Sequence, residues 1–306
     1  MANFVMMVGL PGCGKSTYSN KLAQQGFVVY SSDAIRNELN MHENNQTAKV
    51  FEIMHKRIRV AMQENKDIVY DATNLSRKRR MAYLESIKKY NYHKICYLFI
   101  VPLEVCMERN ALRTGYARVP DHVYNNMLRA FQIPMIEEGW DEIIPILYDG
   151  KIDIKYNYDD LDDFSQDNNH HSLTLGQHMK KATQYVINHT NNDIIIEATK
   201  YHDIGKIYTK EYKNFRGEPT KEAHFYGHDN CGAYMYLIYW LASDKEYKNK
   251  FPLDKALTIG KLINWHMTPL LRWDKSQKAY LNDRKIISDE FYDMIRLMHE
   301  GDMYAH

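Results

Sequence analysis

A glycine-rich loop near the start of the chain has the residues needed to bind the phosphates of a nucleotide. Residues 9–17 match the P-loop pattern G-x-x-x-x-G-K-S/T, between an apolar stretch and a helical one. Glycines let backbone N–H groups turn toward phosphate oxygens, and the positive end of the following helix adds to the attraction. We expect ATP or another nucleoside triphosphate here, with Lys15 on its β- and γ-phosphates and Ser16 on Mg²⁺. The predicted nucleotide-binding residues are Gly9, Gly12, Cys13, Gly14, Lys15, Ser16 and Thr17.

Two carboxylates and an arginine follow the next apolar stretches and could serve the acceptor of the phosphoryl group. Asp33 and Arg36 lie about one helical turn apart after residues 27–31. Asp33 could accept the proton of an attacking hydroxyl, and Arg36 could hold an anionic part of the acceptor. The alternative for Asp33 is a helix N-cap. Asp71 follows a third apolar stretch, where it could contact Mg²⁺ through water or orient Asp33 or Arg36. We therefore expect Lys15, Asp33, Arg36 and Asp71 to carry out phosphoryl transfer.

Two arginines are placed to act on the triphosphate as well. Arg109 and Arg113 are four residues apart, on one face of a predicted helix. Guanidinium groups bind phosphate oxygens bidentately, so such a pair can clamp a triphosphate. On spacing alone, a solvated basic face is an equally good interpretation.

Imidazoles and carboxylates accumulate in the second half of the chain, where ten of the fourteen histidines lie. One histidine on an apolar helix is usually a core residue, but candidates on five separate segments favour a metal site. Adjacent His202 and Asp203 would point about 100° apart on a helix, so both could serve only a site at the seam between their faces or a pair of ions. We expect one or two divalent ions of Mn²⁺, Ni²⁺, Co²⁺, Fe²⁺, Mg²⁺ or Zn²⁺. The candidate ligands are His178, His202, Asp203, His228, His266 and Asp302.

The two candidate sites fall in regions of different periodicity. In the first half, short apolar stretches alternate with amphipathic ones, which predicts an α/β fold with a parallel sheet. The strand-like stretches are 4–9, 27–31, 67–73, 95–101, 143–148 and 152–156. In the second half, apolar residues recur at three- and four-residue spacing, which predicts an all-α domain. The predicted helices are 173–188, 193–201, 227–242, 253–265 and 289–299.

Length and composition are consistent with two domains, which we place at 1–157 and 158–306, with a polar linker after the boundary. The 306 residues exceed what one hydrophobic core usually holds. No run approaches the roughly 20 apolar residues of a membrane-spanning helix. Four scattered cysteines and an apolar start without a basic leader favour the reducing cytoplasm of a bacterium or of a phage-infected host. A net charge of +1 argues against bulk electrostatic capture of nucleic acid, but not against local grooves.

Roughly residues 1–150 resemble the kinase half of phage polynucleotide 5′-kinase/3′-phosphatases. The motifs that carry the resemblance are the P-loop, S-D-x-x-R at 32–36, D-x-T-N-L at 71–75 and R-N-x-x-R-x-G at 109–115. The resemblance implies that Asp33 is the general base for a 5′-OH and that Arg36 binds the phosphate 3′ to the attacked nucleotide. It also implies that Arg109 and Arg113 act on the ATP phosphates. The phosphatase motif of that family, D-x-D-x-T, is absent from the sequence.

About residues 165–306 resemble HD-domain metallophosphohydrolases, as in bacterial CCA-adding tRNA nucleotidyltransferases. The order H…HD…H…H…D carries the resemblance, with H-D-x-G-K at 202–206 and G-H-D-x-x-G-A at 227–233. It implies that Lys206 neutralises charge that develops on a phosphate. It further implies two sets of ligands, His178, His202, Asp203 and Asp302 on one metal, with His228 and His266 supporting a second.

The two resemblances together predict a bifunctional enzyme that heals the ends of nucleic acids. One half would phosphorylate 5′-OH ends of RNA, tRNA included, or of DNA. The other would remove 2′,3′-cyclic, 2′- or 3′-phosphates, so that a separate RNA ligase could join the ends. Basic residues 77–80 would contact the nucleic-acid backbone, unless they are only a solvated helix start. The alternatives are a nucleotide-metabolism enzyme that joins a small-molecule kinase to an HD nucleotidase, and a nucleotide-gated binding or toxin-type module with a degenerate second half.

Overall fold

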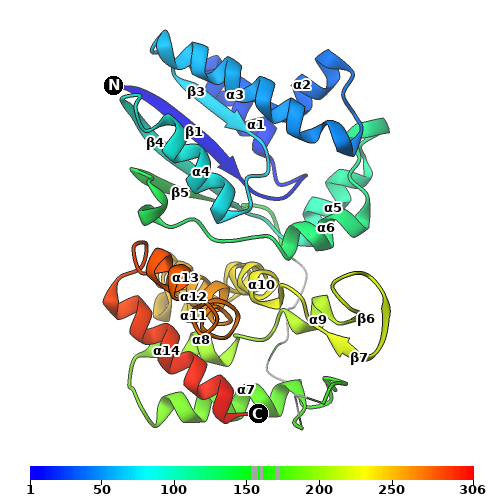
Figure 1. Ribbon diagram of the computed structural model, residues 1–306, viewed down its shortest axis with the longest axis vertical. Coiled ribbons are helices and arrows are strands. Elements are labelled where there is room, and N and C mark those ends of the chain that lie inside the picture. Colours follow the sequence, from blue (N-terminus) through cyan, green and yellow to red (C-terminus); the bar gives the residue numbers. More distant parts are fainter. Residues whose placement is uncertain (153–157, 159–160, 170–171) are drawn as a thin grey trace. The chain divides into compact units, whose positions relative to one another are not determined.

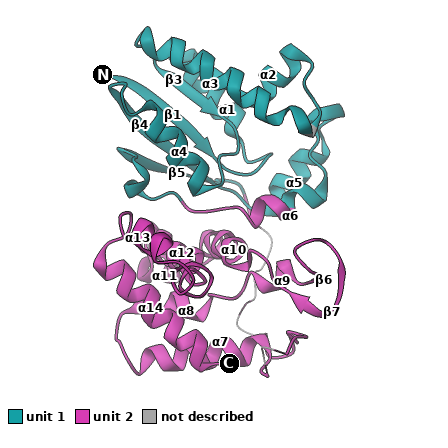
Figure 2. Cartoon of the chain, viewed as in Figure 1, with its two compact units in different colours: residues 1–124, 134–150 teal, residues 125–133, 151–306 magenta. Residues whose placement is uncertain are grey.

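The structure is a computed structural model that describes residues 1–152, 158, 161–169 and 172–306, and its contacts divide the chain into two compact units (Figure 2). Unit 1 comprises residues 1–124 and 134–150, and unit 2 comprises residues 125–133 and 151–306. The strand predicted at 152–156 lies, apart from its first residue, outside the described residues. Residue 157, where the predicted first domain ends, lies outside them as well, so the boundary stays a prediction.

Unit 1 is built on five parallel strands in the order β2-β3-β1-β4-β5 (Figure 1). The strands are β1 (Ala2–Val8), β2 (Val28–Ser31), β3 (Ile68–Asp71), β4 (Tyr92–Ile100) and β5 (Glu142–Leu147). The central strand β1 is apolar along its length, and Phe4, Met6 and Met7 are fully buried. A strand with a neighbour on each side and helices over the sheet has no solvated face, which explains this pattern. The predicted parallel α/β architecture is confirmed.

The helices of unit 1 connect successive strands, because parallel strands need crossover connections. The helices are α1 (Lys15–Gln24), α2 (Ser32–Leu39), α3 (Thr47–Gln63), α4 (Arg77–Ile87), α5 (Leu103–Ala111) and α6 (Asp121–Leu128), with short 3₁₀ turns η1 (Asn44–Gln46), η2 (Gly115–Ala117) and η3 (Ile136–Glu138). Helix α6 spans the division between the units, since unit 1 ends at residue 124 and resumes at residue 134.

The basic stretch 77–80, predicted to contact nucleic acid, is in part a structural element. Arg80 has no exposed side-chain area and binds Glu138 bidentately, with Nε–Oε2 and Nη2–Oε1 both 2.7 Å. The Nε of Arg77, also buried, lies 3.7 Å from the same carboxylate. For these two arginines the prediction is wrong, because α4 turns them inward onto a buried glutamate. The two middle residues of the stretch are exposed.

Unit 2 is helical, and the predicted amphipathic helices are present. The helices are α7 (Leu175–Ile187), α8 (Asp193–Lys200), α9 (Lys206–Thr209), α10 (His228–Ala242), α11 (Lys245–Lys250), α12 (Leu253–Trp265), α13 (Gln277–Asp283) and α14 (Asp289–Tyr304), with a π-helical turn η4 (Pro269–Trp273). The prediction that this half is all-α is wrong. Strands β6 (Glu211–Lys213) and β7 (Pro219–His224) form an antiparallel hairpin. They are too short and too polar for apolar periodicity to reveal them.

A buried amide, that of Asn264, helps to anchor residues 125–133 within unit 2. The Nδ2 of Asn264 donates to the carbonyl oxygen of Phe131 at 3.1 Å, and its Oδ1 accepts from the amide of Ile133 at 2.8 Å. The buried Phe131 ring meets Tyr234 edge-on at 4.9 Å between centroids. A buried amide without partners costs roughly 1–3 kcal/mol, so these bonds tie the segment to unit 2.

No helix in the described part of the chain is both long and apolar enough to cross a bilayer. The four cysteines are free thiols and all are buried. Burial raises the pKa of Cys231 to about 12, so its thiol stays protonated at neutral pH and behaves as an apolar core side chain.

Candidate functional site

The P-loop connects β1 to α1, and two glycines shape it. Gly12 and Gly14 have φ of 80° and 99°, a conformation that side chains rarely adopt. A Cβ on Gly12 would also lie 2.4 Å from the carbonyl oxygen of Cys106. Lys15, the first residue of α1, is buried, and its Nζ donates to the carbonyl oxygen of Leu10 at 2.7 Å. The loop therefore has the tight backbone curvature that phosphate binding requires, and the ammonium group of Lys15 points into it.

Asp71 ends β3 beside this loop. Burial raises the pKa of its carboxyl group, while the charge of Lys15 and hydrogen bonds from Ser19 and Ser16 act in the opposite direction. In P-loop enzymes the loop serine and a carboxylate at the end of a strand hold Mg²⁺ between them. Of the roles considered for Asp71, this position favours the one at Mg²⁺.

Asp33 lies in the first turn of α2, at the same edge of the sheet. Strand residues Ser31 and Asp71 are partners in the β2–β3 register, and Asp33 follows two residues later. Its negative charge contributes to the raised pKa of Asp71, so the two carboxyl groups are within electrostatic reach. The N-cap of α2 is Ser31, whose Oγ accepts from the amide of Ala34 at 3.4 Å. The alternative role of Asp33 as N-cap is therefore wrong, and its exposed carboxylate faces solvent.

The three arginines predicted at this site differ in what they contact. Arg36 is half-buried, with Nη1 3.3 Å from the carbonyl oxygen of Met41 and Nη2 3.0 Å from Oγ1 of Thr47. The Nη1 of Arg109 donates to the carbonyl oxygen of Gly12 at 3.3 Å, so this arginine reaches the P-loop. Arg113 instead donates to a carbonyl oxygen of its own segment, that of Ala117, at 3.5 Å. The structure thus brings Arg109 to the phosphate-binding loop, whereas the role of Arg113 stays a prediction.

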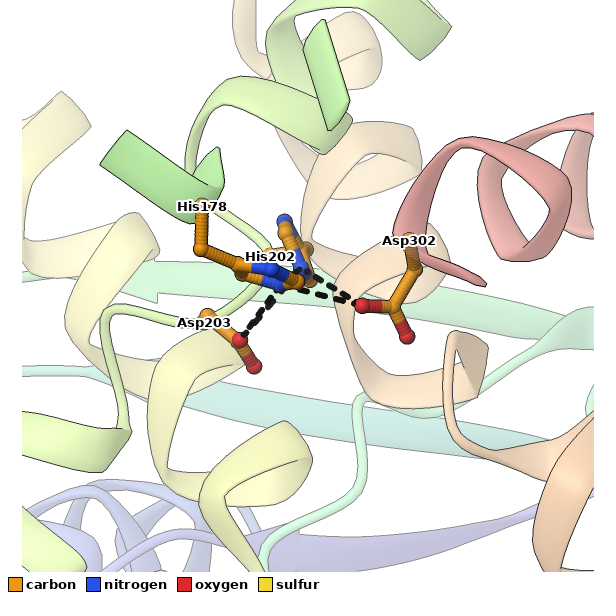
Figure 3. A group of neighbouring side chains, drawn as sticks. All are labelled: His178, His202, Asp203 and Asp302. Carbon is orange, nitrogen blue, oxygen red and sulfur yellow. Dashed lines mark hydrogen bonds and ion pairs between the residues drawn. The ribbon is translucent and has the colours of Figure 1, made fainter. Parts of the chain in front are cut away.

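In unit 2 the six predicted metal ligands converge, and all are buried. They come from five segments, His178 in α7, His202 and Asp203 after α8, His228 at the start of α10, His266 after α12 and Asp302 in α14. They form two groups, and within each group the donor atoms lie within 4.8 Å of one another. The first group is His178, His202, Asp203 and Asp302 (Figure 3). The second group is Asp203, His228 and His266. We call the six residues the His/Asp cluster.

The first group has the spacing of ligands around a single ion. The Nε2 of His178 lies 3.0 Å from Oδ1 of Asp302, 3.3 Å from Oδ2 of Asp203 and 3.2 Å from Nε2 of His202. Donors held about 2.0–2.2 Å from one divalent ion are separated by roughly 3.0–3.5 Å. The donors therefore fit an ion with little rearrangement.

The second group reuses the same aspartate through its other oxygen. The Oδ1 of Asp203 lies 3.1 Å from Nε2 of His228 and 3.6 Å from Nε2 of His266. Residues 201–205 form turns and not a helix, which lets His202 and Asp203 face the same centre despite being adjacent. A carboxylate with one oxygen in each group can bridge two ions, as in two-metal sites.

Main-chain carbonyls orient three of the imidazoles. The Nδ1 atoms of His202, His228 and His266 each lie 2.7–2.8 Å from the carbonyl oxygen three residues earlier, those of Thr199, Phe225 and Ile263. A carbonyl can only accept, so Nδ1 carries the proton and Nε2 presents a lone pair in the neutral ring. The Nε2 atoms of His228 and His266 are 3.2 Å apart, and lone pairs that face one another at this distance repel unless a cation lies between them. The donor set therefore fits a metal.

The charges in the His/Asp cluster also favour a cation. Burial alone would raise the pKa of Asp203, but the charges of Lys206 and His202 hold it well below its usual range. Burial would also raise the pKa of Asp302, but hydrogen bonds from His178 and His202 hold it well below its usual range. Burial lowers the pKa of His178, but Asp203 and Asp302 raise it to about 9, so a proton binds where an ion would.

Lys206 touches the cluster through Asp203 and one further residue. Its buried Nζ lies 2.7 Å from Oδ2 of Asp203 and 2.8 Å from Oε1 of Gln166, which is itself buried. An ammonium clamped in this way orients Asp203, and its predicted action on a phosphate stays a prediction. Sequence reasoning missed Gln166, which no motif marks.

Comparison with known proteins bears on the first part of the chain. Residues 4–134 match the family model AAA_33, described as an AAA domain. The L-seryl-tRNA(Sec) kinase of Methanococcus maripaludis is 24% identical over 159 residues, which cover 50% of this chain and 61% of that protein. Transcription factor bHLH140 of Arabidopsis thaliana is 25% identical over 162 residues, 50% of this chain and 17% of that protein. The chain thus spans less than two thirds of either relative.

The matched segment contains the P-loop, Asp33, Asp71 and Arg109. The N-terminal part is a P-loop kinase-like domain. Among solved structures, a chain of the "Structure of Pnkp1/Rnl/Hen1 complex" aligns with 18% identity and a TM-score of 0.31, over 39% of this chain and 43% of that chain. The family match ends at residue 134, before the His/Asp cluster, so the likeness of the second half to HD-domain proteins stays a prediction.

Two residues that support the kinase-like domain were not foreseen. The buried Tyr124 donates to the carbonyl oxygens of Pro11 at 3.0 Å and Cys106 at 3.3 Å, bracing the P-loop from 113 residues away. Asn110 bonds Val119 twice, through its Nδ2 at 2.7 Å and its Oδ1 at 3.0 Å, and closes the intervening segment into a loop. Only the position of Asn110 between the two predicted arginines could have drawn attention to it.

Proposed function

We propose that this protein heals the ends of broken nucleic acid, RNA in the first place. The kinase-like domain phosphorylates 5′-OH ends, and unit 2 removes 2′,3′-cyclic, 2′- or 3′-phosphates. The observation that carries the proposal is the convergence of six buried metal-ligand side chains in a chain that also has a P-loop kinase-like domain. Cleavage of RNA through its 2′-OH leaves a 5′-OH and a cyclic phosphate, and these two activities reverse both.

In the kinase reaction, Asp33 takes the proton of the acceptor hydroxyl as its oxygen bonds to the γ-phosphorus of ATP. The bond between that phosphorus and the β–γ bridging oxygen breaks, and ADP leaves with the electron pair. Lys15 and Arg109, which both contact the P-loop, stabilise the charge on the transferred group. When bound between Ser16 and Asp71, Mg²⁺ would neutralise phosphate charge. The name of the seryl-tRNA kinase relative, a kinase of an RNA-linked acceptor, supports an acceptor of this class.

In the hydrolytic reaction, the His/Asp cluster would hold one or two divalent ions, with Asp203 offering one oxygen to each group of ligands. Bound ions would lower the pKa of water and polarise the phosphate. Lys206 keeps Asp203 ionised and correctly turned through its 2.7 Å contact. Water adds to phosphorus, one P–O bond of the end group breaks, and the departing ribose oxygen receives a proton. A separate RNA ligase would then act on the 5′-phosphate and 3′-OH.

The test is turnover of an RNA that carries a 5′-OH and a 2′,3′-cyclic phosphate, with ATP and Mn²⁺, Ni²⁺ or Mg²⁺. Lys15→Ala should lose only 5′ phosphorylation, and His202→Ala only end hydrolysis. The matched controls are Lys21→Ala, an exposed lysine later in α1, and His189→Ala, an exposed histidine of unit 2, and both should keep both activities. Faster phosphorylation of free nucleosides or mononucleotides than of the RNA would instead establish the nucleotide-metabolism alternative.

A further inference from the structure

Two aromatic rings from distant parts of the kinase-like domain stack face to face. His42 follows α2, and Tyr116 lies in η2, between α5 and α6 (Figure 1). Their ring centroids are 4.1 Å apart and their planes differ by 4°. Tyr116 nevertheless remains 79% exposed. The pair therefore presents a flat aromatic surface to solvent.

On one side, the stack belongs to the acceptor end of the proposed kinase site. His42 follows Met41, whose carbonyl oxygen accepts from Nη1 of Arg36 at 3.3 Å. The amide of Met41 in turn donates to the carbonyl oxygen of Arg36 at 2.9 Å. The loop that carries His42 thus wraps around Arg36, which lies one helical turn beyond Asp33. An acceptor that reaches Asp33 and Arg36 comes close to this loop.

On the other side, the stack belongs to the loop that Asn110 closes onto Val119. That loop follows α5, whose Arg109 reaches the P-loop at Gly12. Leu112, at the start of the same loop, is 86% exposed. The ring of Tyr116 is therefore held where the phosphate-binding side and the acceptor side of the kinase-like domain meet.

We propose that Tyr116, backed by His42, is the stacking platform for the nucleobase of the 5′-terminal nucleotide of the acceptor. This inference rests on the proposed kinase function and names the part of the acceptor that the site recognises. Stacking on an exposed aromatic face is sequence-tolerant, since every base has a π-face, and it is worth about 1–3 kcal/mol per base. A platform of this kind suits an enzyme that must accept any broken end.

The experiment measures KM and kcat for two 5′-OH oligonucleotides that differ only in whether the first nucleotide carries a base or is abasic. Tyr116→Ala should raise KM for the base-bearing strand about tenfold and leave KM for the abasic strand and for ATP unchanged. Tyr116→Phe should restore the wild-type KM, because the ring and not the hydroxyl stacks. Leu112→Ala, an equally exposed residue of the same loop, should change neither strand.

Three results would overturn the platform. An equal rise in KM for both strands would make the stack a latch that closes the loop, and a rise in KM for ATP would make it an adenine site. An unchanged KM for the base-bearing strand would leave the ring without a role in binding. If the wild-type protein phosphorylates neither strand, the proposed kinase function itself fails, which is a separate result from any change caused by Tyr116→Ala.

Discussion

The Nε2 atoms of His228 and His266 lie 3.2 Å apart, although each ring directs Nδ1 at a main-chain carbonyl. Two neutral imidazoles held in this way confront each other with lone pairs and without a proton to share. Such an arrangement is stable only when a cation relieves the repulsion. The Nε2 atoms of His178 and His202 are also 3.2 Å apart, and there the raised pKa of His178 lets a proton supply the positive charge. The His/Asp cluster is therefore built around positive charge.

Removing divalent ions should destabilise the protein. A ligand at 100 times its dissociation constant stabilises the folded state by about 2.7 kcal/mol. Each kcal/mol changes Tm by about 2–4 °C in a domain of about 150–250 residues, a range that includes unit 2. We expect chelation followed by desalting to lower Tm by at least about 5 °C and Mn²⁺ or Ni²⁺ to restore it. Asp203→Ala should bind almost no metal by elemental analysis, while His189→Ala should bind as much as wild type. Full metal content in Asp203→Ala would contradict the bridging role.

Replacing Gly12 by alanine should impair the fold and nucleotide binding together. The new Cβ would meet the carbonyl oxygen of Cys106 at 2.4 Å and would need a φ of 80°. We expect Gly12→Ala to cost about 3 kcal/mol of unfolding free energy and to abolish ATP binding. Gly26→Ala is the matched control, with a φ of 98° and nothing within 4 Å of the added methyl. It should cost only about 1 kcal/mol and keep ATP binding, as measured by denaturant unfolding and calorimetry.

The buried pair of Arg80 and Glu138 should behave as a structural unit. Arg80→Met leaves Glu138 buried without its bidentate partner, which typically costs about 3–5 kcal/mol. The double variant Arg80→Met with Glu138→Gln should recover part of that loss. Exposed Arg79 offers the comparison, because Arg79→Met should leave the unfolding free energy within about 0.5 kcal/mol of wild type. If Arg80→Met and Arg79→Met lost equal amounts of unfolding free energy, the stability of α4 would not depend on the buried pair.

Acid should destabilise unit 1 through His55. Burial lowers the pKa of His55 to about 4 from an ordinary value of 6.5, and its Nε2 lies 3.0 Å from the hydroxyl of Tyr70. Between these two pH values the unfolded chain binds more protons than the folded one, so stability falls as pH falls. Because the ring is only half-buried, we expect a loss of about 1–2 kcal/mol between pH 7 and pH 4.5.

The measurement is the unfolding free energy of wild type and His55→Phe across that range. The advantage of wild type over His55→Phe in unfolding free energy should shrink or reverse toward low pH, because phenylalanine takes up no proton. Parallel curves from pH 7 to pH 4.5 would contradict the assignment.

The sequence was most informative where a motif combines local chemistry with local geometry. The P-loop motif dictates both the residue types and the turn that presents them. The H-D-x-G-K motif marked the residues of the His/Asp cluster, but not the turns at 201–205 that let His202 and Asp203 face one centre. Arg80 and Asn264 show where such reasoning fails. Their partners, Glu138 and the backbone of residues 131–133, are 58 to 133 positions away, and no periodicity encodes a pairing over that distance.

The hairpin of β6 and β7 was missed for a different reason. Its strands are stabilised by a turn and a few cross-strand bonds and not by an apolar face. Gly217, with a φ of 82°, donates to the carbonyl oxygen of Asn214 at 2.8 Å and forms that turn. The short polar strands on either side gave no alternation to detect.

The amide of Asn264 has a practical consequence for anyone who divides this protein. A fragment that starts at residue 151 would omit Phe131 and Ile133, and with them two of the three bonding partners of that side chain, leaving only Asn230. It would also lose the ring that packs beside Tyr234. Such a truncated polypeptide would expose an apolar hole and leave the Oδ1 of Asn264 without its donor, and we would expect it to aggregate. Supplying residues 125–133 in trans as a peptide, or grafting them onto the new amino terminus, should rescue its solubility.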